Sequence, residues 1–390
     1  MSADFCPETI PPMKHALINR RHFLRTAAAL ALPSIARAAA PPADDAFSFA
    51  LLGDLHYDRM EHHDMAWLEK NKAGDLSQIR NYSRITADIT PELFASVRES
   101  VAEAKAAFVL QVGDLVEGLC GTEAHAARQN REAIAFIESM KLGVPFLFTK
   151  GNHDVTGDGA AEAFKKVFHP YLGQQTETFK GGGKLTSATY TIEHGGALFC
   201  FFDAYDKASL DWLEAALAKR TARHCFVVIH PPVVPYGARA TWHLYSAERD
   251  NARRGKLLAL LGRQNAFVLG GHIHKFNTLT RTTPGGGKFV QLAVSSIINA
   301  LETKPKAQLS GIGEYNSDQI RVEPAHSPAT EQERRAVYEA ESPFVKTFEY
   351  ADLPGHAVVT VSASQVTARI FSGVSRQLWR TVDLARAMNG

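Results

Sequence analysis

The stretch Gly151-Asn152-His153-Asp154 stands near the middle of this chain of 390 residues, at the point where a short apolar run ends. That run, residues 144–149, predicts a buried parallel strand. After the stretch, apolar side chains recur at helical spacing from residue 161 to residue 168. An amide, an imidazole and a carboxylate therefore follow a predicted strand directly. Open α/β sheets bind their ligands in this position, outside the carboxyl ends of the strands.

Four other predicted strands end in the same way, with Asp or His beside Gly or Pro. The strands and the polar residues that follow them are 47–52 with Asp54 and His56, 107–112 with Asp114, 225–229 with His230, and 266–269 with His272 and His274. Side chains two residues apart point the same way from an extended strand end, which pairs Asp54 with His56. The same spacing pairs His272 with His274.

Helices are predicted at 90–104 and 123–141, between the first three strands. This alternation predicts parallel strands joined by right-handed crossovers, so that their polar carboxyl ends converge on one side. The second half adds the predicted strands 186–193 and 197–202, the helices 208–219, 250–262 and 331–341, and a closing hairpin of 357–361 and 366–371. These strands predict a second sheet packed on the first.

The composition is that of a globular protein, with 45% apolar and 22% charged residues. The formal net charge of +2 arises at the N-terminus. Five of the 43 basic residues and two of the 41 acidic residues lie in the first 38 positions, which leaves a net charge of −1 for the rest. A nearly neutral chain gives no electrostatic reason to expect binding to nucleic acid or to an anionic membrane.

The N-terminus predicts an export signal. Residues 19–25, Asn-Arg-Arg-His-Phe-Leu-Arg, precede a mild apolar run at 26–32 and the small-residue cleavage site Ala36-Arg37-Ala38. This is the order of an export signal, and the paired arginines before Phe-Leu resemble a twin-arginine signal. The apolar run is too short for a membrane span, and no later stretch reaches about 18 apolar residues. We therefore expect residues 1–38 to be removed, and the twin-arginine export machinery to deliver a soluble chain to the periplasm.

The side chains at the predicted strand ends offer only oxygen and nitrogen ligands. They are Asp54, His56, Asp114, Asn152, His153, His230, His272 and His274. Such ligands suit Mn, Fe, Zn or Co and disfavour soft-metal centres. The set is too large for one tetrahedral zinc ion and matches two metal ions that share a carboxylate. The sequence therefore predicts a dinuclear metal site.

The motifs Asp54-x-His56, Gly113-Asp114, Gly151-Asn152-His153-Asp154, His230 and Gly271-His272-x-His274 occur in the order found in the calcineurin-like metallophosphoesterase family, which the chain resembles over residues 50–275. The resemblance implies a four-layer α/β/β/α sandwich of two mixed β-sheets, within the α/β class, over residues 47–372. It also implies two metal-ligand sets that share one bridging residue. These are Asp54, His56 and His274 on one metal, Asn152, His230 and His272 on the other, and Asp114 bridging both.

The resemblance gives roles to two further residues. His153 is implied to assist the phosphoryl or leaving group, and Asp154 to orient His153. Glu117 stands where the family often has Asp or Asn, and we place it outside the ligand set.

The resemblance also implies that the chain hydrolyses a small phosphoester by attack of water activated between two cations. Monoesters and diesters both stay open as substrates. Two other interpretations stay open as well: a non-catalytic metal-binding scaffold with the same fold, and a dinuclear hydrolase that acts on a non-phosphate bond.

The segments outside the motifs are predicted to be a flexible leader at 39–46, insertions at about 58–89, 233–249 and 301–350, and a C-terminal tail at 373–390. We expect the insertions to govern substrate choice. Within them, His62 and His63 are predicted to be solvated loop residues, with contacts at the substrate rim as the alternative.

Several other side chains are candidates for contacts outside the metal site. Tyr236, Trp242 and Tyr245 are candidates to stack on a substrate, with packing of their own loop as the equal alternative. Lys150, Arg239 and Arg249 are predicted to be solvated, with contact to a substrate phosphate as the alternative. Cys200 and Cys225 lie in predicted core strands, where a free thiol packs as a small apolar group. Neither these two nor Cys120 is given a functional role.

Overall fold

The computed structural model of the chain describes residues 46–237, 241–317, 328 and 330–389. The predicted signal at 1–38, nearly all of the leader at 39–46, and Arg239 lie outside these described residues. Within the described ranges, no helix combines the length and the apolar character needed to cross a bilayer.

The first sheet has six strands, among them the first and the last strands of the described residues. Their order is β14 (Gln377–Asp383), β13 (Val366–Ser372), β12 (Gly355–Val361), β1 (Phe47–Leu52), β2 (Val109–Gln111) and β3 (Phe146–Phe148). The strands β1, β2 and β3 are parallel, as the strand–helix alternation predicts. The closing hairpin of β12 and β13 was predicted to belong to the second sheet, and that prediction is wrong. It joins the first sheet, because β12 pairs antiparallel with β1.

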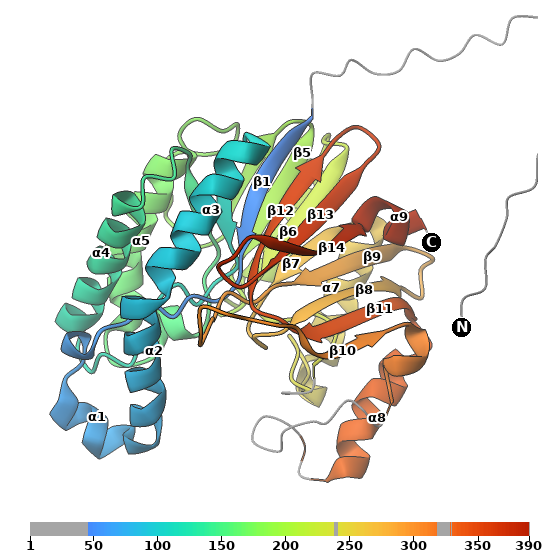
Figure 1. The fold of residues 1–390 in the computed structure, drawn as a ribbon. Helices are drawn as coiled ribbons and strands as arrows, with labels where there is room; N and C mark the ends of the chain where they lie inside the picture. Colours follow the sequence, from blue (N-terminus) through green and yellow to red (C-terminus); the bar gives the residue numbers. More distant parts are fainter. Residues whose placement is uncertain (1–45, 238–240, 318–327, 329, 390) are drawn as a thin grey trace, which may run out of the picture. The chain divides into compact units, whose positions relative to one another are not determined.

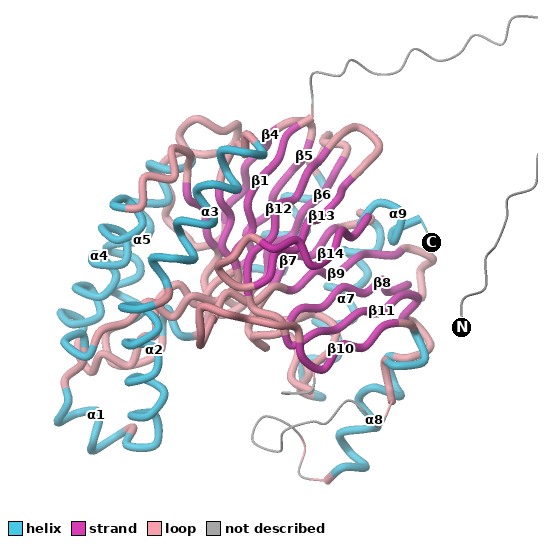
Figure 2. The backbone as a smooth tube through the Cα atoms, viewed as in Figure 1, coloured by secondary structure: helices cyan, strands magenta, loops and turns pink. Residues whose placement is uncertain are grey.

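The second sheet has eight strands and comes from the second half of the chain. Their order is β10 (Lys306–Ser310), β11 (Val345–Asp352), β8 (Phe276–Thr282), β9 (Lys288–Ala293), β7 (Phe267–Gly270), β6 (His224–Ile229), β5 (Ala197–Phe202) and β4 (Tyr190–His194). Both sheets contain parallel and antiparallel pairs, so both are mixed. Figure 2 shows their strands in magenta and the surrounding helices in cyan.

Aromatic side chains fill the space between the two sheets. The ring of Phe49 on β1 lies 5.4 Å from that of Phe199 on β5 and 5.7 Å from that of Phe226 on β6, measured between centroids. All three side chains are fully buried. Alternate residues of the second sheet, such as Cys200 and Val227, point to a separate apolar cluster on its other face. This alternation is what a strand covered on both faces requires.

Helices cover the outer face of each sheet and complete four layers. Three helices lie on the side of the first sheet, as Figure 1 shows: α3 (Thr90–Ala104), α4 (Glu123–Ser139) and α5 (Ala160–Thr176). Two helices lie beside the second sheet, α6 (Ser209–Ala218) and α7 (Asn251–Arg263). The predicted four-layer α/β/β/α sandwich is therefore confirmed.

The structure differs from the prediction in the segments outside the motifs. The predicted tail at 373–390 contains β14 and a short helix, α9 (Leu384–Asn389), in which Leu384 and Met388 are buried. The predicted insertion at 58–89 folds into α1 (Met65–Asn71) and α2 (Leu76–Asp88), and that at 301–350 contains β10, most of β11 and α8 (Glu331–Glu341). Of these elements only the helix at 331–341 was predicted, and the polar sequences of the others show no clear hydrophobic periodicity.

Candidate metal centre

The predicted metal ligands lie on the loops that follow five strands, β1, β2, β3, β6 and β7. Four of them have left-handed backbone conformations: His56 with φ 47°, Asp114 with φ 54°, His272 with φ 69° and His274 with φ 57°. Residues other than glycine seldom adopt this conformation, and it is concentrated at functional sites where the surrounding structure enforces it. The loops are therefore shaped to aim these side chains.

Two glycines in the motifs permit the loops to approach one another. A Cβ atom on Gly151 would lie 2.1 Å from Oδ1 of Asp114, and a Cβ atom on Gly271 would lie 2.5 Å from Oδ2 of Asp54. Both distances are far below van der Waals contact. The glycines beside the ligands are thus required because they leave space for the ligand carboxylates.

The first ligand group contains Asp54, His56, Asp114 and His274, whose ligand atoms all lie within 4.8 Å of one another. The Nε2 atoms of His56 and His274 are 3.2 Å apart. Nε2 of His274 is 3.7 Å from Oδ1 of Asp54, and Nε2 of His56 is 3.7 Å from Oδ2 of Asp114. The first three residues of the group are fully buried or nearly so.

The second ligand group contains Asp114, His230 and His272. Nε2 of His230 lies 3.0 Å from Oδ2 of Asp114 and 3.2 Å from Nδ1 of His272. Asp114, His272 and His274 line a cavity, which we call the metal cavity, and Asn152 lines it as well. Oδ1 of Asn152 accepts a hydrogen bond of 3.4 Å from the hydroxyl of Tyr205. Asp114 belongs to both groups, in the position of a bridging ligand.

The geometry and charge of these residues fit two transition-metal ions. Two imidazole nitrogens on one ion, each about 2.1 Å from it, are separated by about 3.0–3.4 Å, and each group contains such a pair at 3.2 Å. Burial raises the pKa of Asp54, and the neighbouring carboxylate of Asp114 raises it further. Two carboxylates buried side by side are costly unless cations offset them.

His153 and Glu117 lie beside the first group. Nδ1 of His153 donates a hydrogen bond of 2.8 Å to the backbone oxygen of Glu117 and lies 3.3 Å from Oε2 of the same residue. Burial opposes protonation of His153, but the carboxylates of Asp114 and Glu117 outweigh it and raise its pKa to about 10. Bound cations would reverse part of that effect. Because Nδ1 is engaged, Nε2 is the atom available to a substrate.

Glu117, which we placed outside the ligand set, contacts a predicted ligand directly. Its Oε2 accepts a hydrogen bond of 2.5 Å from Nδ1 of His56, and its Oε1 accepts one of 2.8 Å from the amide of Gln78. Burial opposes its ionisation, yet His56 and His153 lower its pKa to about 2. One signal in the sequence could have revealed it: Glu117 is the only charge in the apolar stretch 115–120, and a charge in such a place needs a partner.

The expectation that Asp154 orients His153 is replaced by a different role. The Asp154 carboxylate accepts backbone N–H hydrogen bonds of 2.7 Å from Gly151, 3.1 Å from Asp114 and 3.1 Å from Val116. It therefore ties the loop after β3 to the loop after β2. Glu117, and not Asp154, holds the imidazole of His153.

The prediction for His62 and His63 is wrong, because both are buried. Nε2 of His63 lies 2.9 Å from Oδ1 of Asp58, and Nε2 of His62 lies 3.0 Å from Oε2 of Glu132. These contacts fasten the segment before α1 to the core. They leave neither histidine in the solvated or rim position that was expected.

Among the aromatic candidates, Tyr236 and Tyr245 are buried and pack within their own region. Trp242 lines the metal cavity with an exposed fraction of 36%, and its ring centroid lies 4.8 Å from that of His272. Tyr205, 38% exposed, lines the same cavity of about 530 Å³.

Lys150, Arg249 and the three described cysteines do not line the metal cavity. The Lys150 ammonium pairs with Asp203, while Arg249 is exposed. Cys120, Cys200 and Cys225 are buried free thiols, in agreement with the core positions predicted for the last two.

Comparison with known proteins supports the resemblance. No curated protein sequence matches the chain. The solved structure of PhoD matches at 13% identity with a TM-score of 0.50, covering 87% of this chain and 68% of that one. The purple acid phosphatase PPD1 from yellow lupin (Lupinus luteus) seeds matches at 11% identity with a TM-score of 0.50. That match covers 88% of this chain and 55% of the lupin chain, so the present chain spans about half of the lupin protein.

At these identities the two structures establish a shared fold. The family model described as calcineurin-like phosphoesterase matches residues 47–276, a segment that contains every predicted ligand. The chain belongs to the calcineurin-like phosphoesterase family.

Proposed function

We propose that this chain is a metal-dependent phosphoesterase that hydrolyses phosphomonoesters or phosphodiesters. The observation that carries the proposal is the position of Asp114, whose carboxylate belongs to two groups of potential ligands. Asp54, His56 and His274 would hold one ion, and Asn152, His230 and His272 the other. Two such ions, when bound, supply an activated water and polarise the phosphoryl oxygens.

The protein contributes orientation, and Glu117 and Val112 provide part of it. The Glu117 carboxylate engages Nδ1 of His56, and the Val112 carbonyl accepts a hydrogen bond of 2.9 Å from Nδ1 of His230. In both cases the contact at Nδ1 leaves Nε2 facing the ligand group. Such contacts fix the tautomer and rotation of a ligating imidazole before the metal arrives.

His153 is the proposed proton donor. Its Nδ1 is held by the Glu117 backbone, so Nε2 is directed toward the cavity in which the ester would lie. A protonated imidazole there donates a hydrogen bond to the phosphoryl group or a proton to the departing oxygen. Replacement by alanine should lower kcat while the metal content stays near that of the unmodified protein. Loss of metal in His153→Ala would instead place the residue among the ligands.

The experiment that tests the proposal measures metal content together with hydrolysis of nitrophenyl phosphate and bis-nitrophenyl phosphate. We expect two transition-metal ions per chain and turnover of at least one ester. Asp114→Asn should lose both ions, whereas His272→Ala and His274→Ala should each lose one. Turnover by a chain without metal, or no turnover after Mn, Fe, Zn or Co is supplied, would refute the assignment.

We further propose export to the periplasm by the twin-arginine machinery, supported by Arg20, Arg21 and the Ala36-Arg37-Ala38 site. The mature N-terminus, determined by mass spectrometry on a periplasmic fraction, should begin near residue 39. Replacing both arginines by lysine should retain the uncleaved chain in the cytoplasm. A cleaved, exported double variant would contradict the twin-arginine route.

A further inference from the structure

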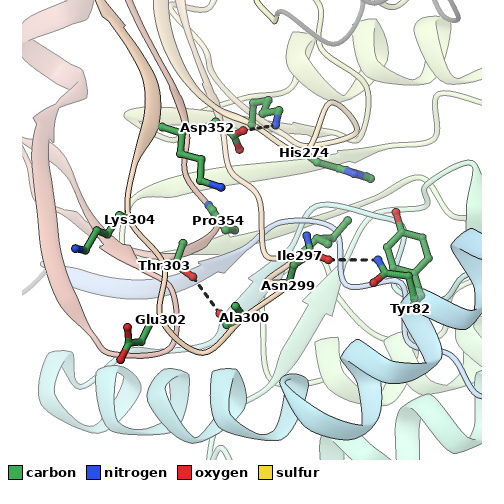
Figure 3. Close-up of a pocket in the computed structure, with 13 residues that line it drawn as sticks. Tyr82, His274, Ile297, Asn299, Ala300, Glu302, Thr303, Lys304, Asp352 and Pro354 are labelled. Carbon is green, nitrogen blue, oxygen red and sulfur yellow. Dashed lines mark hydrogen bonds and ion pairs between the residues drawn. The ribbon is translucent and has the colours of Figure 1, made fainter.

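A second cavity of about 510 Å³ adjoins the metal centre. It shares Tyr82 and His274 with the metal cavity, so the two spaces meet at those side chains. Figure 3 shows Tyr82 and His274 at one end of it, and Thr303 and Lys304 at the other. A molecule whose phosphoryl group rests among the metal ligands can therefore extend past His274 into this space.

The walls of the second cavity are rich in cations. Lys275, Lys304 and Lys306 line it, and the Arg84 guanidinium donates a hydrogen bond of 3.3 Å to the backbone oxygen of Asn299, another lining residue. The acidic groups that line it are Asp352 and Glu302. Three lysines thus line the cavity together with two carboxylates.

One of the two carboxylates, that of Asp352, already has a lysine partner. Nζ of Lys275 lies 2.8 Å from Oδ2 of Asp352, and Lys306 lies opposite Asp352 in the pairing of β10 with β11. In the described ranges, no carboxylate forms an ion pair with Lys304 or Lys306. Both side chains are exposed and able to reach an incoming group. The positive charge of the cavity is therefore available to a ligand.

We propose that this cavity, which we call the lysine pocket and define by Lys275, Lys304, Lys306 and Glu302, is a subsite for a second anionic group on the substrate. The group is a phosphate or a carboxylate attached to the alcohol part of the ester. Lysine ammonium groups bind such anions as point charges, and a partly enclosed cavity with net positive charge concentrates them. The inference rests on the proposed function and narrows its substrate class to esters that carry two anionic groups.

The test measures binding of non-hydrolysable probes to the full chain loaded with Mn²⁺, by calorimetry. The probes are propylphosphonate, the propanediyl and pentanediyl bisphosphonates, and the carboxyalkyl phosphonates of the same lengths. We expect at least one two-anion probe to bind about tenfold more tightly than propylphosphonate, the gain from two partly exposed charges. A gain with either second anion supports the subsite, and the best linker length measures its distance from the metal centre.

Matched variants assign the gain to the lysine pocket. The double variant Lys304→Gln/Lys306→Gln should reduce the preference for two-anion probes to within about twofold, and Glu302→Gln should increase it. Lys346→Gln is the control, since Lys346 is exposed on the same strand as Asp352 and its Nζ contacts the Pro343 carbonyl outside the cavity. Added salt should shrink the preference in the unmodified protein and leave the double variant nearly unchanged.

Three outcomes would overturn the inference. They are equal affinity for one-anion and two-anion probes, no binding of any probe, and a preference that survives in the double lysine variant. Hydrolysis of nitrophenyl phosphate by the same preparations tests the proposed function separately. Absence of turnover with a lysine-dependent preference intact would refute hydrolysis and leave the anionic subsite standing. Turnover of nitrophenyl phosphate without any preference for two-anion probes would refute the anionic subsite and leave the proposed hydrolysis standing.

Discussion

Oε2 of Glu117 lies 2.5 Å from Nδ1 of His56, and both side chains are completely buried. The contact joins residues that are 61 positions apart, on the loops after β1 and β2. It fixes the His56 ring with Nε2 toward Asp114 and His274, while the same carboxyl group lies 3.3 Å from His153. One buried glutamate therefore orients both a predicted ligand and the predicted proton donor.

Glu117→Ala should weaken metal binding about 10- to 100-fold, because the His56 imidazole loses the partner that sets its tautomer and rotation. Titration against a chromogenic chelator measures the effect. Glu138→Ala, at an exposed position of α4, is the control. Glu117→Gln should fall between the two, since an amide keeps the shape and loses the charge. Unchanged metal affinity in Glu117→Ala would show that the contact does not position the ligand.

Gly271→Ala should weaken metal binding through a steric clash. The added Cβ would lie 2.5 Å from Oδ2 of Asp54 and 2.9 Å from Cγ2 of Val112, so the carboxylate must move. Overpacking of this kind costs about 1–3 kcal/mol, and urea unfolding with and without metal should show the larger loss with metal present. Gly285→Ala is the matched control, because no heavy atom lies within 4 Å of the added Cβ. The same loss in both variants would contradict the explanation.

Trp242→Ala should reduce selectivity for aromatic esters. The indole is 36% exposed beside the His272 ring, where it can stack on a planar leaving group. We expect the ratio of kcat/KM for naphthyl phosphate over propyl phosphate to fall about 2- to 10-fold, from the loss of one aromatic contact. The alkyl ester serves as the internal control. An equal decrease for both esters would mean that Trp242 supports the metal centre and does not select the substrate.

His356 should make the protein less stable in acid. It is buried on β12, where burial above all, with Arg376 nearby, lowers its pKa to about 3. The unfolded chain takes up the proton near pH 6.5, so the stability is complete above that pH and declines as the pH falls toward 3. At pH 4.5 the loss is about 3 kcal/mol.

His356→Gln removes this titration. Urea unfolding at pH 7 and pH 4.5 should therefore show a smaller acid loss in the variant than in the unmodified protein, by about 2–3 kcal/mol. Both proteins share every other titrating group, so the difference isolates His356. Identical losses would show that the folded protein accommodates a charged His356.

The sequence predicted the parts of the structure that depend on local pattern. The strand at 47–52 and the helix at 331–341 have the predicted bounds, and the structure brings together the loops that carry Asp54, His230 and His272. Whether these residues bind metal stays a prediction. Strand ends are predictable because apolar runs and the glycines beside the ligands mark them in the sequence.

The parts that could not be predicted depend on contacts between distant residues. The buried His62 side chain contacts Glu132, which is 70 positions away in the sequence. The polar segment β14 forms a strand because it pairs with the strand β13. Similarly, Asp154 is next to His153 in sequence but accepts its hydrogen bonds from backbone groups. Adjacency in sequence suggested a side-chain contact that the fold does not make.

The pairing of β1 with β12 sets the order in which the protein can be completed. The loop with Asp54 and His56 follows β1, and β12, which pairs with one edge of β1, is synthesised about 300 residues later. Until residues 355–361 leave the ribosome, β1 has an open edge that can pair with other chains. The first sheet can therefore be completed only after residues 355–361 have been synthesised, and a chain truncated before β12 should aggregate and not retain a partly active core.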